Sequence, residues 1–135
     1  MIPVEKLCPV ILRAVDIGPQ VLVFAHPLAG MQLVKGTREA GESVFDGVLR
    51  ELAEESGLVD ATVSANLGSS SAIVEDQVWH FVKVEALGLG DQWTFETTDD
   101  GGQRFDFSWW PLIREPGPEW HESFVKALRY IRAAV

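Results

Sequence analysis

Three glutamates at helical spacing are the residues of this sequence that most suggest chemistry. If residues 43–57 form a helix, Glu51, Glu54 and Glu55 fall within a single arc of roughly 100°. Like charges at these spacings repel each other, so the arrangement needs a compensating positive charge. A divalent cation such as Mg²⁺ or Mn²⁺ would supply it, because hard ions prefer carboxylate and phosphate oxygens. A solvated acidic face without a ligand is the alternative, and the helix alone does not decide between the two.

The elements around these acids predict a loop followed by a short helix. Ser43 is a suitable N-cap, and Gly57 is a natural C-terminal stop because glycine adopts the left-handed conformation without a steric cost. Gly47 lies one turn before Glu51, where a glycine suggests that space is needed for a ligand. An apolar face at helical spacing would pack this helix on a core; its residues are Phe45, Val48, Leu49 and Leu52.

The spacing of residues 36–58 is more specific than the acids alone. Gly36 is followed by five residues and Glu42, then by seven residues and the run Arg50-Glu-Leu-Ala-Glu-Glu-Ser-Gly-Leu58. This pattern resembles the Nudix box, the signature of the Nudix hydrolases, at every defined position, and we refer to residues 36–58 as the box. Val34 departs from the proline that many relatives carry before the box, but this position shapes a loop and does no chemistry.

The resemblance implies roles for individual residues. Glu51, Glu54 and Glu55 match the family's metal-binding glutamates, and the Gly36 carbonyl matches its backbone ligand for Mg²⁺ or Mn²⁺. Such ions neutralise phosphate oxygens and lower the pKa of a bound water. The catalytic residues expected from the match are Glu54, as the first candidate for the general base, Glu51 and Arg50. Residues with a structural role in the box are Glu42, Arg50 and Gly57.

Some relatives draw the base from outside the box, so acids in other loops stay open as alternatives. These are Glu75, Asp76, Glu96, Asp99 and Asp100.

Composition favours one globular domain over residues 1–135. The chain is 47% hydrophobic and 23% charged, with a formal net charge of −9. An acidic surface repels polyphosphate backbones and argues against general nucleic-acid binding. A single cysteine, Cys8, excludes a disulfide framework, and the sequence shows no secretory leader and no apolar run long enough for a membrane span. We expect a cytoplasmic protein with a small nucleotide substrate, no membrane partner and a possible homodimer.

The order of the remaining elements predicts the fold class. Strand patterns occupy residues 4–14, 21–25, 31–35, 61–67, 71–74, 77–86 and 103–112, and residues 88–102 read as a long functional loop. A second helix is predicted to begin at Pro116–Pro118. This α/β (α+β) pattern, with one helix in the middle and one at the end, suits an α/β/α sandwich around a central mixed sheet, which the Nudix resemblance also implies.

Substrate contacts are less well marked in the sequence. Trp79 and Trp93 are candidates for stacking on a base, and Arg38 is a third candidate for binding substrate. Residues 70–78 lack the proline of ADP-ribose hydrolases and the tyrosine of dinucleoside polyphosphate hydrolases.

The predicted function is metal-dependent hydrolysis of a phosphoanhydride in a nucleoside triphosphate or a nucleotide sugar. Two alternatives remain: a Nudix-fold module that senses a nucleotide without turning it over, and an RNA 5′-end pyrophosphohydrolase. The net charge weighs against the second of these.

Overall fold

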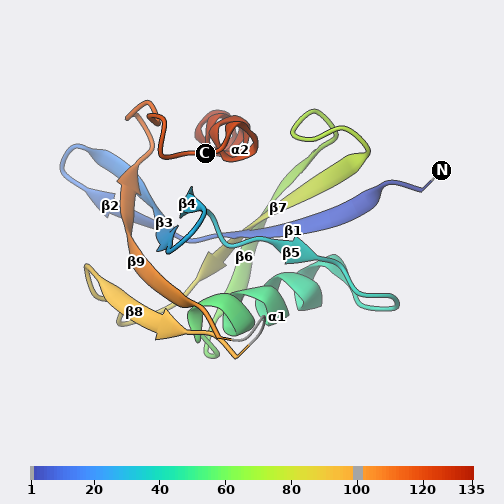
Figure 1. Ribbon diagram of the computed structural model, residues 1–135, viewed down its shortest axis with the longest axis horizontal. Helices are drawn as coiled ribbons and strands as arrows, with labels where there is room; N and C mark the ends of the chain where they lie inside the picture. The colour runs from blue at the N-terminus through green and yellow to red at the C-terminus, as the bar shows by residue number, and fades with distance from the viewer. Residues whose placement is uncertain (1, 99–101) are drawn as a thin grey trace.

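The computed structural model describes residues 2–98 and 102–135, in which two sheets lie between two helices (Figure 1). Helix α1 spans Val44–Ser56 and helix α2 spans Glu122–Ala134. The strands in chain order are β1 (Val4–Val10), β2 (Leu12–Val15), β3 (Gly18–His26), β4 (Gly30–Gln32), β5 (Gly36–Thr37), β6 (Thr62–Ser70), β7 (Gln77–Glu85), β8 (Trp93–Glu96) and β9 (Arg104–Pro111).

The first sheet is mixed and has the strand order β5-β1-β7-β6. Its central strands β1 and β7 run parallel, while β5 and β6 pair antiparallel at the two edges. The second sheet is antiparallel in the order β2-β3-β9-β8, with β4 paired to β3. The predicted α/β/α sandwich is confirmed, but the predicted single central sheet is divided into two. The division begins at Ile11, where the chain leaves β1 in one sheet and enters β2 in the other.

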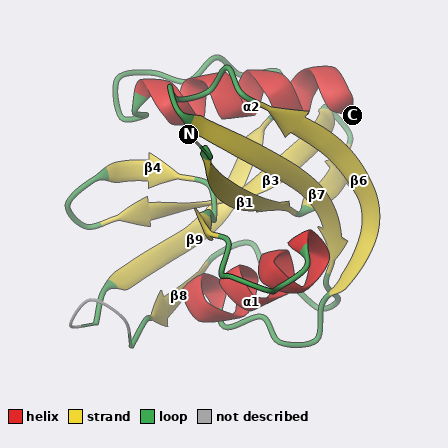
Figure 2. Ribbon diagram, turned by 90° about the vertical axis from the view of Figure 1, so that its right-hand side faces the viewer, coloured by secondary structure: helices red, strands yellow, loops and turns green. Residues whose placement is uncertain are grey.

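Each helix covers one face of the sheets and closes its own hydrophobic core (Figure 2). Strand β7 contributes to both cores, because successive side chains of a strand point to opposite faces. Trp79 and Phe81 pack in the core under α2, whereas Val82 and Val84 pack in the core under α1. Burial on both faces fixes the register of β7, since a slip by one residue would exchange the two sets.

Strand β8 occupies part of the segment predicted to be a long loop. Trp93, Thr94 and Phe95 belong to residue types that favour strands, and they pair with β9 from Trp93 opposite Phe107 to Glu96 opposite Arg104. The glycines and aspartates on either side of this short strand hid its signal. The predicted strand at residues 71–74 is absent, because β6 ends at Ser70.

The C-terminal helix begins later than predicted. The His121 side chain accepts the Ser123 N–H at 3.1 Å and caps α2, so Pro116–Pro118 lie in the preceding loop. In the described parts of the chain, no helix has the length and apolar character needed to cross a membrane.

Candidate functional site

The box folds as a strand, a loop and a capped helix. Ser43 Oγ accepts the Asp46 N–H at 3.1 Å, so the predicted N-cap is confirmed. Gly57 ends α1 in the left-handed conformation at φ 77°, and its N–H donates to the Ala53 carbonyl at 3.0 Å. A side chain at Gly57 would also lie against the Phe95 ring, so α1 and β8 approach each other closely there. These ends fix where the acids of α1 stand relative to the sheets.

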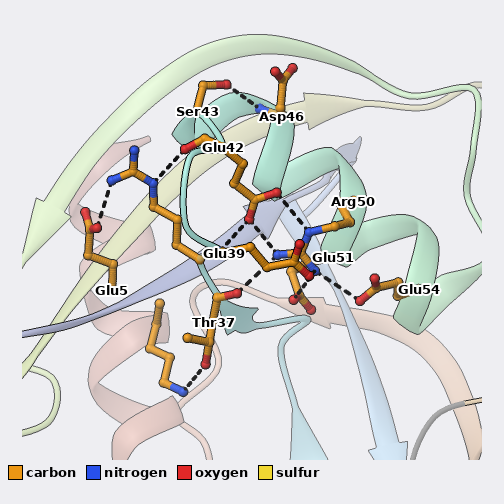
Figure 3. A network of polar contacts seen from close by, with 11 residues as sticks. Glu5, Thr37, Glu39, Glu42, Ser43, Asp46, Arg50, Glu51 and Glu54 are labelled. Atoms are coloured by element: carbon orange, nitrogen blue, oxygen red, sulfur yellow. Dashed lines mark hydrogen bonds and ion pairs between the residues drawn. The ribbon is translucent and has the colours of Figure 1, made fainter.

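Arg50 is the centre of the polar network at this site (Figure 3). Its Nε and Nη2 donate to the two oxygens of Glu42, at 2.9 and 2.7 Å, in a bidentate pair. Nη2 also donates to the Thr37 carbonyl at 3.1 Å, which ties the helix to β5. On the other side of the guanidinium, Nη1 donates to Glu51 at 2.7 Å and to Glu54 at 3.1 Å. One cation therefore joins the loop acids to the helix acids.

Glu42 is the acid that this network stabilises most clearly. Its two hydrogen bonds from Arg50, together with one from the Glu39 N–H at 2.8 Å, lower the pKa of Glu42 to about 2. The carboxylate therefore stays ionised and holds the loop against the helix over the whole physiological pH range.

Glu51 lies against the backbone of Gly36. The residue is only 7% exposed, and a Cβ at Gly36 would sit inside its carboxyl group. Glycine at position 36 is thus required for the close approach of β5 to α1. Burial raises the pKa of Glu51, against the lowering effect of Arg50.

Glu55 has no arginine partner among the described residues and shows the opposite behaviour to Glu42. Burial, followed by the charge of Glu51, raises its pKa to about 8, although the Lys35 backbone N–H and the Lys35 charge act in the other direction. A buried carboxyl with such a pKa is partly protonated at neutral pH. The box thus holds more acid than its own cations neutralise.

The residues present fit a divalent cation in kind, since Glu51, Glu54 and Glu55 offer hard oxygen donors and a deficit of positive charge. Within residues 2–98 and 102–135, however, no three acidic, histidine or cysteine side chains converge closely enough to hold an ion as they stand. Arg50 Nη1 holds Glu51 and Glu54 instead. Binding one ion with all three of these carboxylates therefore requires at least one of the side chains to turn.

A cavity of about 260 Å³ opens beside the outer end of the acidic face. Glu54 and Glu55 line it together with residues from β3 and β4, the segment leading into the box, and the end of the β8–β9 hairpin. Those residues are His26, Gln32, Lys35, Thr97, Gln103 and Phe105. The cavity thus combines two acids, a lysine, other hydrogen-bonding groups and one aromatic ring, so it offers a ligand mainly polar contacts.

The sequence did not identify most of this lining. His26, Gln32, Thr97 and Gln103 belong to no motif, and they meet only because β3, β4 and β9 are neighbours in the second sheet. Their polar side chains beside predicted turns were the only available signal, and many surface residues share it.

The three predicted substrate contacts lie in different environments. Trp79 is 1% exposed, with its ring packed by Phe81 and Phe124, so the prediction that a base stacks on it is wrong. Trp79 is buried because β7 is covered on both faces. Arg38 donates to Glu5 at 2.8 Å and to the Glu42 carbonyl at 2.9 Å, which occupies its guanidinium within the loop.

Trp93 remains accessible. It stacks on Phe107 at 5.2 Å and lines a separate open cavity of about 530 Å³ with residues of β3, β8 and β9. It does not line the cavity that contains Glu54 and Glu55.

The alternative acids outside the box also differ in whether they line a cavity near Glu54. Glu96 lines an adjacent cavity of about 290 Å³ that shares Thr97 and Gln103 with the one beside Glu54. Glu75 and Asp76 lie at the turn before β7 and line neither of these cavities. Asp99 and Asp100 lie outside the described residues.

Gly47 serves packing rather than ligand space. A Cβ there would come within 2.4 Å of Leu7 Cδ1 and 2.7 Å of Glu42 Oε1. The residue faces β1 and the Glu42 carboxylate, so the prediction that it clears room for a ligand is wrong. Helical spacing placed it on the acid side, but it did not show how closely α1 lies on β1.

Comparison with known proteins is consistent with this architecture. A family model described as the NUDIX domain matches residues 10–128. No curated protein matches the sequence. Among solved structures, an ADP-ribose pyrophosphatase from Streptococcus suis 89-1591 has a TM-score of 0.70 at 16% identity, with 98% of this chain and 91% of that chain covered.

Two further structures are similar in fold. A NUDIX hydrolase from Nitrosomonas europaea has a TM-score of 0.63 at 15% identity, covering 96% of this chain and 72% of that chain. The NUDIX domain of Shewanella oneidensis NrtR, solved in complex with ADP ribose, has a TM-score of 0.56 at 18% identity, covering 97% and 87%. At these identities the structural likeness supports the fold, while the family match covers most of the chain.

Proposed function

Since this chain belongs to the Nudix hydrolase family, we propose that it is a metal-dependent pyrophosphohydrolase that cleaves a phosphoanhydride bond of a small nucleotide. The observation that carries the proposal is the position of Glu54 and Glu55 next to the buried Glu51. Both line a cavity together with other polar side chains and the ring of Phe105. The raised pKa of Glu55 supports it, because such an excess of acid suits a site that takes up a cation.

Glu51, Glu54, Glu55 and the Gly36 carbonyl would hold Mg²⁺ or Mn²⁺. The bound ion would neutralise phosphate oxygens and lower the pKa of the attacking water. Glu54 is the proposed general base, since its side chain is 41% exposed and lines the cavity where substrate and water enter. Arg50 Nη1 donates hydrogen bonds to Glu51 and Glu54 and so orients these two acids. Glu42 fixes Arg50 in turn.

The proposed substrates are nucleoside diphosphates linked to another moiety, of the nucleoside triphosphate or nucleotide-sugar type. The solved structures described as an ADP-ribose pyrophosphatase and as an ADP ribose complex support including nucleotide sugars. The same complex gives weight to a second candidate, a nucleotide-sensing module, although this chain keeps every acid of the box. A cytoplasmic location, a single domain over residues 1–135 and a homodimer remain part of the proposal.

The test is a hydrolysis screen of the purified protein. The panel contains normal and oxidised nucleoside triphosphates, ADP-ribose, UDP-glucose, dinucleoside polyphosphates, 5′-triphosphorylated RNA and, as a simple monoester, p-nitrophenyl phosphate. Each substrate is incubated with Mg²⁺, with Mn²⁺ or with excess chelator, and products are identified by chromatography and ³¹P NMR. We expect metal-dependent release of a nucleoside monophosphate from at least one small nucleotide. Ligand binding without turnover would support the sensing module, and phosphate released from a simple monoester would contradict the proposal.

A further inference from the structure

His26 ends β3 on the face that looks towards α1. Leu22 and Phe24, two and four residues earlier, pack in the core under α1, and the alternation of the strand places His26 on the same side. The chain then turns and returns as β4, with His26 paired to Gly30. The imidazole thus stands where the second sheet meets the acidic end of the helix, and it lines the cavity with Glu54 and Glu55.

The hydrogen bonds of this ring define its tautomer. Nδ1 accepts the Leu28 N–H at 3.0 Å and the Ala29 N–H at 3.2 Å. A nitrogen that accepts two backbone N–H groups carries no proton itself. The neutral ring therefore carries its hydrogen on Nε2, where it is a donor.

Nε2 is the nitrogen left for a ligand. Across residues 2–98 and 102–135, no hydrogen bond or ion pair involves His26 Nε2. The ring is held in place on its face, because it packs 5.3 Å from Phe105, which itself stacks on Phe24 at 4.3 Å. The ring is thus held by the turn and by Phe105, which Phe24 supports in turn, and its remaining donor is unused. Such preorganisation is typical of a group that binds a ligand.

We propose that His26 binds the substrate directly, by donating its Nε2–H to a non-bridging phosphate oxygen of the phosphoanhydride. This inference rests on the proposed function and names a contact within the same cavity. The phosphate is the part of the nucleotide that must lie beside Glu54 and Glu55. It is therefore also the part that His26, which lines the same cavity, can reach. A neutral donor adds a hydrogen bond to the anion without adding a charge that the neighbouring acids would attract instead.

Two substitutions separate the donor from the turn. His26→Asn keeps a short acceptor that can receive the Leu28 and Ala29 N–H groups, as Asx turns do, but it deletes the donor at the Nε2 position. His26→Gln extends an amide N–H₂ towards that position but gives up the local acceptor. His121→Asn is the matched control, because His121 also accepts a backbone N–H through Nδ1 and caps α2 outside the cavity.

The first measurement is the Kd of a methylene-bridged nucleoside triphosphate analogue with Mg²⁺, together with kcat/KM for the best substrate. We expect His26→Asn to lose about 10- to 100-fold in both, the range for a hydrogen bond to a charged group. His26→Gln should recover part of the affinity at a lower Tm, and His121→Asn should match the wild type. Equal Kd and kcat/KM for His26→Asn and wild type would overturn the inference and leave His26 as a turn residue.

The second measurement needs no substitution. Long-range ¹H–¹⁵N spectra of the wild-type protein should show the Nε2–H tautomer of His26, with a shift of that proton when the analogue binds. A protonated Nδ1, or an Nε2–H signal unchanged by saturating analogue, would overturn the inference. Because binding is measured without turnover, a protein that binds the analogue through His26 but hydrolyses nothing would refute the proposed function alone. A wild type that binds neither this analogue nor a methylene-bridged nucleotide sugar would refute both, because the proposed substrates include both types.

Discussion

Two groups of acids flank Arg50, and the pKa values of Glu42 in one group and Glu55 in the other are shifted in opposite directions. The loop acids, Glu39 and Glu42, lie before the helix, and the bidentate bond from Arg50 lowers the pKa of Glu42 to about 2. The helix acids, Glu51, Glu54 and Glu55, lie along α1, and burial raises the pKa of Glu55 to about 8. The ionised form of glutamate is therefore stabilised at position 42 and disfavoured at position 55.

From this difference we infer a structural role for the loop acids and propose a ligand-binding role for the helix acids. The Glu42 carboxylate accepts hydrogen bonds from Arg50 and from the Glu39 N–H, so its charge holds the loop on the helix, and Glu39 adds an ion pair with Arg50 at 3.5 Å. Among the described residues, the cations near the helix acids are Arg50, through Nη1, and Lys35, and two of the helix acids line a cavity. Perturbed carboxyl groups at a cavity are typical of sites that bind or react. A cation bound to the helix acids would neutralise their charge, as Arg50 neutralises that of Glu42.

The largest effect is expected from removing a charge among the helix acids. Glu54→Gln or Glu51→Gln should lower kcat by about 10²- to 10⁴-fold, the range for a general base or an equivalent catalytic group. The Tm without metal should stay the same or rise slightly, because the change relieves repulsion. Glu39→Gln, in the loop acids and outside the cavity, is the comparison variant and should keep most of the turnover. Near wild-type rates for both helix variants with saturating metal would show that the box is not the reaction centre.

Arg50→Ala should affect both groups at once. It removes the partner of Glu42 and the cation that holds Glu51 and Glu54. We expect a loss of about 2–3 kcal/mol in the free energy of unfolding, as for hydrogen bonds to charged groups, and a clear loss of turnover. Arg50→Lys keeps the charge but not the forked geometry and should recover only part of either. Denaturant unfolding and kinetics measure the two effects, and an unchanged Tm with unchanged metal affinity would contradict the linking role.

Gly47→Ala should lower stability rather than chemistry. The added methyl group would meet Leu7 and the Glu42 carboxyl, and overpacking of this kind costs about 1–3 kcal/mol. The rate per folded molecule should change little, because Gly47 does not line the cavity. Gly90→Ala is the control, since a Cβ there meets no atom closer than 3.9 Å. A stable but inactive Gly47→Ala protein would place the ligand on this face after all.

The smallest effects are opposite dependences of stability on pH. The pKa of Glu42 is lowered from 4.5, so its stabilisation is present above about pH 4.5 and is lost as the pH falls towards 2. The pKa of Glu55 is raised to about 8, so its ionisation costs stability as the pH rises from 4.5 through 8. Glu42→Gln should therefore flatten the acid side of the Tm profile without metal, and Glu55→Gln the neutral to alkaline side. Parallel profiles for wild type and both variants would remove the distinction between the two groups.

Local sequence signals predicted the parts of this molecule that depend on neighbours in the chain. Ser43 and Gly57 delimit α1, and the spacing of the box identified Glu42 and the three helix acids. The errors concern contacts between distant segments: the burial of Trp79 between two layers, the close packing of Gly47 on Leu7, and the pairing of β8 with β9. Such contacts follow from the topology, which periodicity along one strand or helix does not contain.

The cavity illustrates the same limit. Glu54 and Glu55 were found from the box, but His26 and Gln103 reach them only through the order of strands in the second sheet. The sequence therefore predicts the proposed chemistry better than the substrate, because the proposed metal-binding acids share one helix and the lining of the cavity comes from several segments.

The most direct test of the account is the Tm of the wild-type protein as a function of Mn²⁺ concentration at pH 7.5, beside Glu55→Gln and Glu39→Gln. A ligand that binds only the folded state stabilises it by about 2.7 kcal/mol at one hundred times its Kd. We predict a saturable rise in Tm for the wild type and for Glu39→Gln, and a much smaller rise for Glu55→Gln. No rise in the wild type, or an equal rise in all three proteins, would contradict the claim that the helix acids form a cation site distinct from the loop acids.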